Sequence, residues 1–290
     1  MAAKFTFKQF QAQYPDDDAC LDSILSRRYV HADACPHCGV IGKLSRIDGR
    51  RAYACKEGCH VYPCAGTVFE KSTTVLTLWF HAMYLMSATR NGVSAKELQR
   101  KLGVTYKCAW RIGHQLRTLM GAQSDREPPL SRHTEVDEAY IGGRQKGVRG
   151  RGAKGKTIVV GILERTGRIM AKVVENVTRN TLETLIETAV APGSVISTDE
   201  FRSYNHLSEL GNVHGTVSYG AGEYVSGIHH VNGVEGFWSH LKRGIRSTHV
   251  AVSPKHLQKY VEEFGFRYNN CAEPGAMFER MVDKVSIPTC

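Results

Sequence analysis

The sequence lacks the long apolar runs of a membrane protein, because its longest apolar stretches are interrupted far short of a bilayer span. It also lacks a positively charged leader followed by an apolar run, the mark of a secreted protein. No internal repeat of solenoid length is present. We therefore expect a cytoplasmic, nucleoid-associated protein with no membrane partner.

Acidic residues are the minority among the charges. The 290 residues include 28 Asp and Glu against 38 Lys and Arg, which gives a formal net charge of +10 and a pI near 9.2. Clustered basic side chains gain affinity for a polyanion by releasing the counterions condensed on its phosphates. Charge alone does not separate a nucleic-acid-binding protein from an ordinary basic protein, so the motifs must decide.

Cysteines are few outside one short stretch, which holds two closely spaced pairs. The pairs are Cys35 with Cys38 and Cys55 with Cys59. A clustered set of this kind predicts metal binding in a reducing compartment, and two thiolate pairs close a tetrahedral, structural Zn²⁺ site. Because three residues separate the second pair instead of two, His60 could replace Cys59 as the fourth ligand, and Cys64 is a remote alternative.

Periodicity and composition predict several consecutive parts of the chain. They are an N-terminal segment with a zinc ribbon (1–70), a helical module (71–122), a mixed α/β module (132–272) and a C-terminal tail (273–290). The helical module has apolar residues at helical spacing, among them Trp79 and Trp110. Acidic residues and prolines between the helical and α/β modules predict a linker.

The segment from Ser94 to Arg117 predicts a helix, a turn and a second helix. Ser94 and Glu97 form a capping box, and Gly103 supplies the turn before the second helix. Such a pair presents its second helix to the major groove of DNA, and the alternative is a helical hairpin in an ordinary core. The candidate DNA contacts on the second helix are Tyr106, Lys107 and Arg111.

Acidic residues stand at three separate positions in the α/β module. Asp137 lies in the middle of a β-prone run, where a carboxylate is costly unless a cation or donor satisfies it. Asp199 follows another apolar strand, and Glu235 lies on a predicted helix. Two strand aspartates and a helix carboxylate can converge to hold two Mg²⁺ ions about 4 Å apart, an arrangement typical of phosphoryl transfer.

Taken together, the motifs resemble the ISXO-type, Merlin-related insertion-sequence transposases. The resemblance runs from Phe7 to about Asn270. It is carried by the four cysteines, by Val136–Gly143, by Thr198 with Asp199, by Val231–Arg243, by Ser253–His256 and by Phe264–Asn270.

The resemblance implies an RNase H-like α/β catalytic domain, a mixed sheet with flanking helices, preceded by a zinc ribbon and a helix-turn-helix module. It assigns Asp137, Asp199 and Glu235 to a DDE triad that binds Mg²⁺ or Mn²⁺. Lys242 resembles the basic residue that DDE enzymes have two helical turns after the glutamate and that binds DNA. Some relatives have asparagine at the third acidic position, so Asn232 is an alternative to Glu235 as the third catalytic residue. Otherwise Asn232 would support Glu235, either by capping the helix or by orienting a metal-bound water.

The implied function is that of a DNA transposase acting on transposon ends and target DNA as a homo-oligomer. The resemblance implies that a metal-activated water would cut a phosphodiester at the transposon end and that the freed 3′-hydroxyl would then attack target DNA. Further basic residues expected to hold DNA are Arg144, Lys146, Arg149, Arg151, Lys154 and Arg243. The rival functions are a zinc-dependent transcription regulator that has lost catalysis and a nuclease that cuts without joining.

Overall fold

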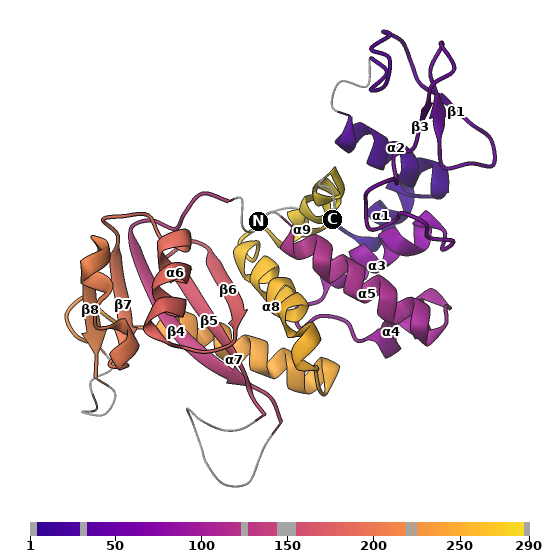
Figure 1. The fold of residues 1–290 in the computed structure, drawn as a ribbon. Coiled ribbons are helices and arrows are strands. Elements are labelled where there is room, and N and C mark those ends of the chain that lie inside the picture. The colour runs from indigo at the N-terminus through magenta and orange to yellow at the C-terminus, as the bar shows by residue number, and fades with distance from the viewer. Residues whose placement is uncertain are drawn as a thin grey trace. The chain divides into compact units, whose positions relative to one another are not determined.

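The computed structural model describes residues 5–29, 34–122, 127–143, 155–218, 222 and 225–286. It divides the chain into two compact units (Figure 1), Met1–Gln123 with Ala272–Cys290 and Ser124–Cys271. Within the described ranges no helix is long and apolar enough to cross a bilayer.

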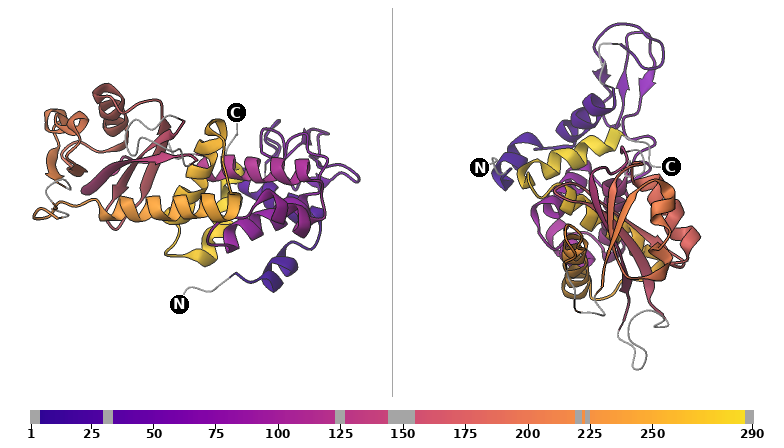
Figure 2. Two further views of the ribbon diagram at one scale, coloured as in Figure 1. Left: turned by 90° about the horizontal axis from the view of Figure 1, so that it is seen from below. Right: turned by 90° about the vertical axis from the view of Figure 1, so that its left-hand side faces the viewer.

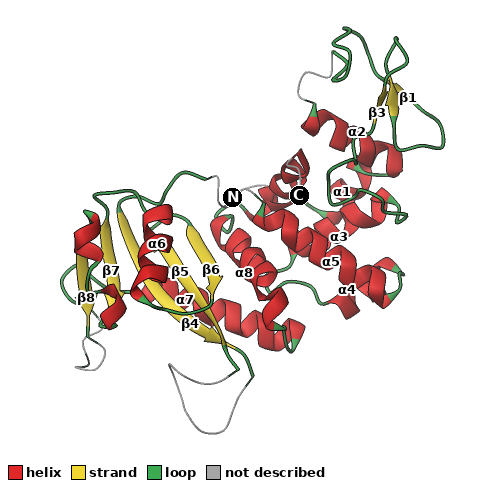
Figure 3. Cartoon of the chain, viewed as in Figure 1, coloured by secondary structure: helices red, strands yellow, loops and turns green. Residues whose placement is uncertain are grey.

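The first unit is mainly helical, with a small sheet beside the helices (Figure 3). Its helices are α1 (Phe7–Gln13), α2 (Asp17–Arg28), α3 (Leu76–Ala88), α4 (Ala95–Leu102), α5 (Tyr106–Gly121) and α9 (Met277–Asp283). The strands β1 (Ser45–Arg46), β2 (Tyr53–Ala54) and β3 (His60–Val61) pair antiparallel in chain order. Where the sequence predicted a C-terminal tail, the structure has α9. Its Phe278 ring lies 5.7 Å from Phe10 and 5.6 Å from Tyr14, because the apolar side of this short helix completes an aromatic core.

Helix α4 begins and ends where the sequence predicted, and α5 begins there but continues past Arg117 to Gly121. Ser94 accepts from the Glu97 backbone N–H at the start of α4, and Thr105 accepts from the Cys108 N–H at the start of α5. Gly103 ends α4 with φ of +66°, a conformation that is unstrained only without a Cβ. These caps confirm a helix, a tight turn and a second helix.

The second unit is built on a five-stranded sheet with the order β6-β5-β4-β7-β8. The strands are β4 (His133–Ile141), β5 (Thr157–Glu164), β6 (Ile169–Val174), β7 (Val195–Asp199) and β8 (Val213–Val217). The first three in the chain form an antiparallel meander, and β7 and β8 run parallel to β4. This order and these directions define an RNase H-like sheet, which confirms the predicted fold.

Helices cover both faces of this sheet (Figures 1 and 2). Helix α6 (Arg179–Ala189) packs Leu182 and Ile186 against Val136 of β4. On the other face, α7 (Asn232–Gly244) and α8 (Pro254–Asn269) contribute to a core that contains Ala139 of β4. The sheet therefore has two separate apolar layers, and side-chain alternation decides which layer each strand residue enters.

The exposed edge of β6 is covered by two amides from α8. Asn269 accepts from the Ile169 backbone N–H at 2.8 Å and donates to its carbonyl at 3.1 Å. Gln258 accepts from the Val173 N–H at 2.8 Å and donates to the Ala171 carbonyl at 3.3 Å. These bonds replace those of a missing neighbouring strand, so the edge is not left open to another chain.

Candidate active site and zinc ribbon

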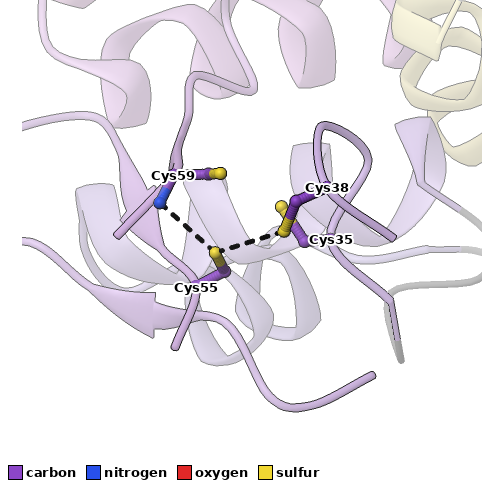
Figure 4. Close-up of side chains that lie close together, drawn as sticks. All are labelled: Cys35, Cys38, Cys55 and Cys59. Carbon is purple, nitrogen blue, oxygen red and sulfur yellow. Dashed lines mark hydrogen bonds between the residues drawn. The ribbon is translucent and has the colours of Figure 1, made fainter. Parts of the chain in front are cut away.

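Four cysteines of the first unit bring their sulfur atoms together (Figure 4). The Sγ atoms of Cys35, Cys38, Cys55 and Cys59 all lie within 4.8 Å of one another, and those of Cys38 and Cys55 are 3.7 Å apart. A tetrahedral site with Zn–S bonds of about 2.3 Å has S–S edges of about 3.8 Å. The four residues therefore fit one zinc ion.

Two tight turns build the cysteine cluster. The Gly39 N–H donates to the Cys35 carbonyl at 2.8 Å, and the Gly58 N–H donates to the Cys55 carbonyl at 3.0 Å. Both glycines have positive φ, +71° and +80°, which a side chain would strain. The Cys59 N–H in turn donates to the Cys55 sulfur at 3.3 Å. Each turn thus folds its pair of thiols toward the same point.

The electrostatics of the cluster suit a cation. A hydrogen bond from the His37 N–H lowers the pKa of Cys35 to about 7, whereas neighbouring thiols raise the pKa of Cys59 to about 12. Four thiols so close cannot all ionise unless a metal balances their charge. Of the alternative ligands, His60 is an exposed residue of β3 outside the group, and burial raises the pKa of Cys64, also outside it, to about 11.

Asp137 and Asp199 lie on one face of the central sheet. Glu135 pairs with Ser197 across the parallel strands, so the alternation places Asp137 and Asp199 on the side of α7. Burial raises the pKa of Asp137 to about 7, and the charges of Glu138 and Asp199 act in the same direction. Two repelling carboxylates, one in the middle of β4 and one at the end of the neighbouring β7, form a hard oxygen donor set, which fits a divalent cation.

Helix α7 brings Glu235 and Lys242 to the same region. Burial lowers the pKa of Lys242, and the nearby charges of Arg246 and Lys156 lower it further. The negative charges of Asp137 and Glu235 act against this shift, so Lys242 lies close enough to both carboxylates for their charges to affect its pKa. Glu235 itself is exposed, and within the described residues the three carboxylates do not form one group at metal-ligand distance, as the four cysteines do.

The start of α7 is capped by a side chain from the sheet. Oε2 of Glu135 accepts from the Gly233 N–H at 2.8 Å and from the Val234 N–H at 3.1 Å. Asn232, expected to cap this helix or orient a metal-bound water, makes no side-chain cap bond and is exposed. The expected cap is corrected: a buried carboxylate already occupies the first free N–H groups of the helix.

Glu135 belongs to a buried polar network. Its carboxylate, 1% exposed, accepts from Arg165 Nε at 2.9 Å, and His230 Nδ1 lies 3.1 Å away. Arg165 also donates to the carbonyls of Ile228 and His230, the residues that lead into α7. The network therefore fixes both the start of α7 and the chain before it. Sequence reasoning missed Glu135, although it lies two residues before Asp137 on the same strand face, and nothing in the sequence pointed to Arg165.

The α4–α5 surface exposes some of the predicted DNA contacts. Tyr106 is 45% exposed with Lys96 Nζ 5.1 Å from its ring centre, and Lys107 is exposed. Arg111 instead packs over Trp79, 5.5 Å from the ring centre, and donates to Ser72 at 2.9 Å. The neighbouring Trp110, expected among the apolar positions, is 38% exposed, and its ring lies 3.9 Å from that of His114.

The remaining basic candidates divide between exposed and undescribed residues. Arg243 is exposed in the last turn of α7. Five others, Arg144, Lys146, Arg149, Arg151 and Lys154, lie outside the described residues.

An RNase H-like sheet with two aspartates on one face is typical of nucleic-acid phosphoryl-transfer enzymes. The ISXO2-like transposase domain matches residues 129–269, and the transposase zinc-ribbon domain matches residues 15–61. The chain belongs to the ISXO2-like transposase family and is an insertion-sequence DNA transposase.

The chain is similar to two curated proteins over substantial lengths. It is 29% identical over 268 residues to an uncharacterized protein in transposable element ISH50 of Halobacterium salinarum, covering 86% of this chain and 89% of that one. It is 30% identical over 103 residues to an uncharacterized transposase-like protein of Haemophilus influenzae, covering 36% of this chain and 82% of that one.

Solved structures with partial similarity include complexes of the Mos1 transposase. A pre-cleavage transpososome matches with a TM-score of 0.29 and 12% identity over 70% of this chain and 77% of that one. A paired-end complex with the left transposon end matches with a TM-score of 0.30 and 13% identity, covering 72% and 79% of the two chains.

Proposed function

We propose that this transposase binds the ends of its insertion sequence and catalyses Mg²⁺-dependent DNA cleavage and strand transfer with Asp137, Asp199 and Glu235. The observation that carries the proposal is the pair of aspartates on the α7 side of two neighbouring strands, where burial, the charge of Glu138 and the charge of Asp199 raise the pKa of Asp137 to about 7. A partly buried pair of carboxylates that repel each other is stabilised by a cation, and groups perturbed in this way cluster at functional sites.

The side chains divide the work of an in-line phosphoryl transfer. Asp137 and Asp199 hold the metal from the sheet, and Glu235 completes the set from α7. Two bound Mg²⁺ ions would activate the attacking oxygen and stabilise the leaving oxygen. Lys242, whose pKa is affected by the charge of Asp137, binds the phosphate and compensates the phosphate's negative charge in the transition state. The protein thus contributes positioning and charge, with no covalent intermediate on a side chain.

Glu235 is the preferred third ligand over Asn232. A carboxylate neutralises part of the cation's charge, whereas an amide offers only one neutral oxygen. The charge of Glu235 affects the pKa of Lys242, which comes seven positions later, so both residues stand on one side of α7. We assign Asn232 only a supporting role, because Glu135 already caps the helix.

In the first unit we propose one structural zinc bound by Cys35, Cys38, Cys55 and Cys59, within residues 1–70. The segment 71–122 is proposed as the end-binding module, with Tyr106, Lys107 and Arg111 on its second helix. Arg111 contributes less to DNA contact, because it is held by Trp79 and Ser72. Target and flanking DNA are proposed to lie against the basic residues 144–154, Lys242 and Arg243, in a homo-oligomer assembled on DNA.

A strand-transfer assay tests the proposed function. Purified full-length protein is incubated with Mg²⁺, a labelled DNA carrying the end of its own insertion sequence, and a supercoiled target. We expect both a nick at the transposon end and a joined product. Nicking without any joining would make the protein a nuclease, and end binding without nicking would make it a regulator, so either result contradicts the proposal.

A further inference from the structure

We infer that Trp238 is a positioning residue for the metal site: its indole N–H fixes one oxygen of Asp137 and leaves the other oxygen to the metal. The inference rests on the proposed function, because it assumes that Asp137 is a metal ligand. Trp238 Nε1 donates to Asp137 Oδ2 at 3.0 Å, and the indole is only 4% exposed. An indole N–H is a donor only, so it cannot itself bind the cation.

A glycine in the sheet makes room for the indole ring. Gly161 of β5 pairs with Asp137, directly below the ring. A Cβ added at Gly161 would lie 2.7 Å from Trp238 Cζ2 and 2.8 Å from Cη2, closer than real contacts allow. Glycine weakens the interior of a strand, so its presence here is explained by the close approach of the ring.

A second attachment fixes the position of α7 along β4. Glu135 binds the N–H of Val234, and Asp137 binds the indole of Trp238. Two residues along a strand span about 6.6 Å, and four residues along a helix span about 6 Å, so the two attachments match in spacing. The helix therefore cannot slide along the strand without breaking one of them. The helix that carries Trp238 is thus held at Val234 and the indole at its N–H, which is what orientation of a ligand requires.

Mn²⁺ binding to the full-length protein, measured by electron paramagnetic resonance, tests the inference apart from activity. Trp238→Phe keeps the ring's bulk but removes the N–H, and we expect Mn²⁺ affinity to fall about 10-fold, the usual effect of losing a partner of a metal ligand. Gly161→Ala, which displaces the indole, should give a loss in the same direction even if Trp238→Phe folds poorly. The matched control is Trp110→Phe, an exposed tryptophan, which should bind Mn²⁺ like the wild type.

Terbium luminescence supplies a second readout at the same site. Tb³⁺ occupies oxygen sites and is excited by a nearby tryptophan, so its emission should be strong in the wild type, lost in Asp137→Asn and much reduced in Trp238→Phe. Asp137-dependent Mn²⁺ binding with unchanged affinity in both Trp238→Phe and Gly161→Ala overturns the inference and leaves the proposed function intact. If the wild type shows no Asp137-dependent Mn²⁺ binding, the proposed metal site fails, and the inference fails with it.

Discussion

The carboxylate of Glu135 illustrates how much one buried residue contributes to this site. It accepts hydrogen bonds from Arg165 and from two backbone N–H groups of α7, so its charge is compensated on three sides. A buried charge without such partners would cost several kcal/mol. Sequence reasoning identified Asp137 because an acidic residue in an apolar strand is conspicuous. It could not identify the role of Glu135, because its partners come from distant parts of the chain.

Replacing Glu135 should destabilise the second unit. Glu135→Ala leaves the Arg165 guanidinium and the α7 N–H groups without their acceptor, and we expect a loss of about 3 kcal/mol in the free energy of unfolding. Glu135→Gln, which keeps one acceptor oxygen, should lose less. Urea denaturation measures both, with the exposed Glu187→Ala of α6 as the control. Equal stability of Glu135→Ala and Glu187→Ala would show that the network holds nothing in place.

His133 gives the second unit a dependence on pH. Burial lowers its pKa to about 4, helped by the charges of Arg165 and His229, while Glu135 opposes the shift. In the unfolded chain histidine has a pKa of about 6.5, so between these values the unfolded state binds more protons. The contribution of neutral His133 to the free energy of unfolding is therefore fully present above about pH 6.5 and is lost as the pH falls toward 4. In thermal melts, His133→Gln should show a smaller decline over that window, and a decline identical to the wild type's would contradict the assignment.

At the scale of elements, the strongly periodic segments were predictable, and the short or irregular ones were not. The runs that form β4, β5 and β6 are long and apolar, and the caps around Gly103 have specific chemistry. Strand β8 has a weak sequence signal because Val213–Val217 contains His and Gly, and the residues before it form short 3-10 turns such as Arg202–Tyr204. Pairing with β7, a tertiary effect, makes this weak segment a strand.

The amides of α8 should protect the edge of β6. Gln258→Ala removes the acceptor of the Val173 N–H, and Asn269→Ala removes both partners of Ile169. Each hydrogen bond contributes about 1 kcal/mol net, so the double variant should melt several degrees lower and aggregate faster through the open edge. Light scattering during a thermal melt measures this, with the exposed Lys255→Ala as the control. Aggregation no faster than that of Lys255→Ala would refute the role of the amides.

At the scale of the whole molecule, the two units have separate cores, and we propose that each depends on its own metal. The ribbon has only two-residue strands, so the proposed zinc would supply much of its folding energy, whereas the second unit has apolar layers on both faces of its sheet. The cysteine spacing predicted that four sulfur atoms would cluster, and the structure brings them together, because these residues are local in sequence. The carboxylate site depends on long-range pairing, so the sequence predicted its members and not their distances.

Zinc removal should therefore affect one unit selectively. We expect purified protein to contain one equivalent of zinc. A chelator should unfold the ribbon while the second unit keeps its own melting transition. Elemental analysis and calorimetry measure the two effects. Cys59→Ala should lose the zinc and His60→Ala should retain it. The reverse result would transfer the fourth ligand to His60.

The most direct test of the account is end cleavage by variants of the acidic residues, measured with Mg²⁺ on DNA that carries the insertion-sequence end. Asp137→Asn, Asp199→Asn and Glu235→Gln should each lose about 100-fold or more of the cleavage rate while remaining folded. Glu138→Gln is the matched control: it lies beside Asp137 but faces Tyr204 on the other side of the sheet, and it should cleave like the wild type. Asn232→Ala should keep measurable activity. Full cleavage by Glu235→Gln together with an inactive Asn232→Ala would contradict the account and give the third position to the asparagine.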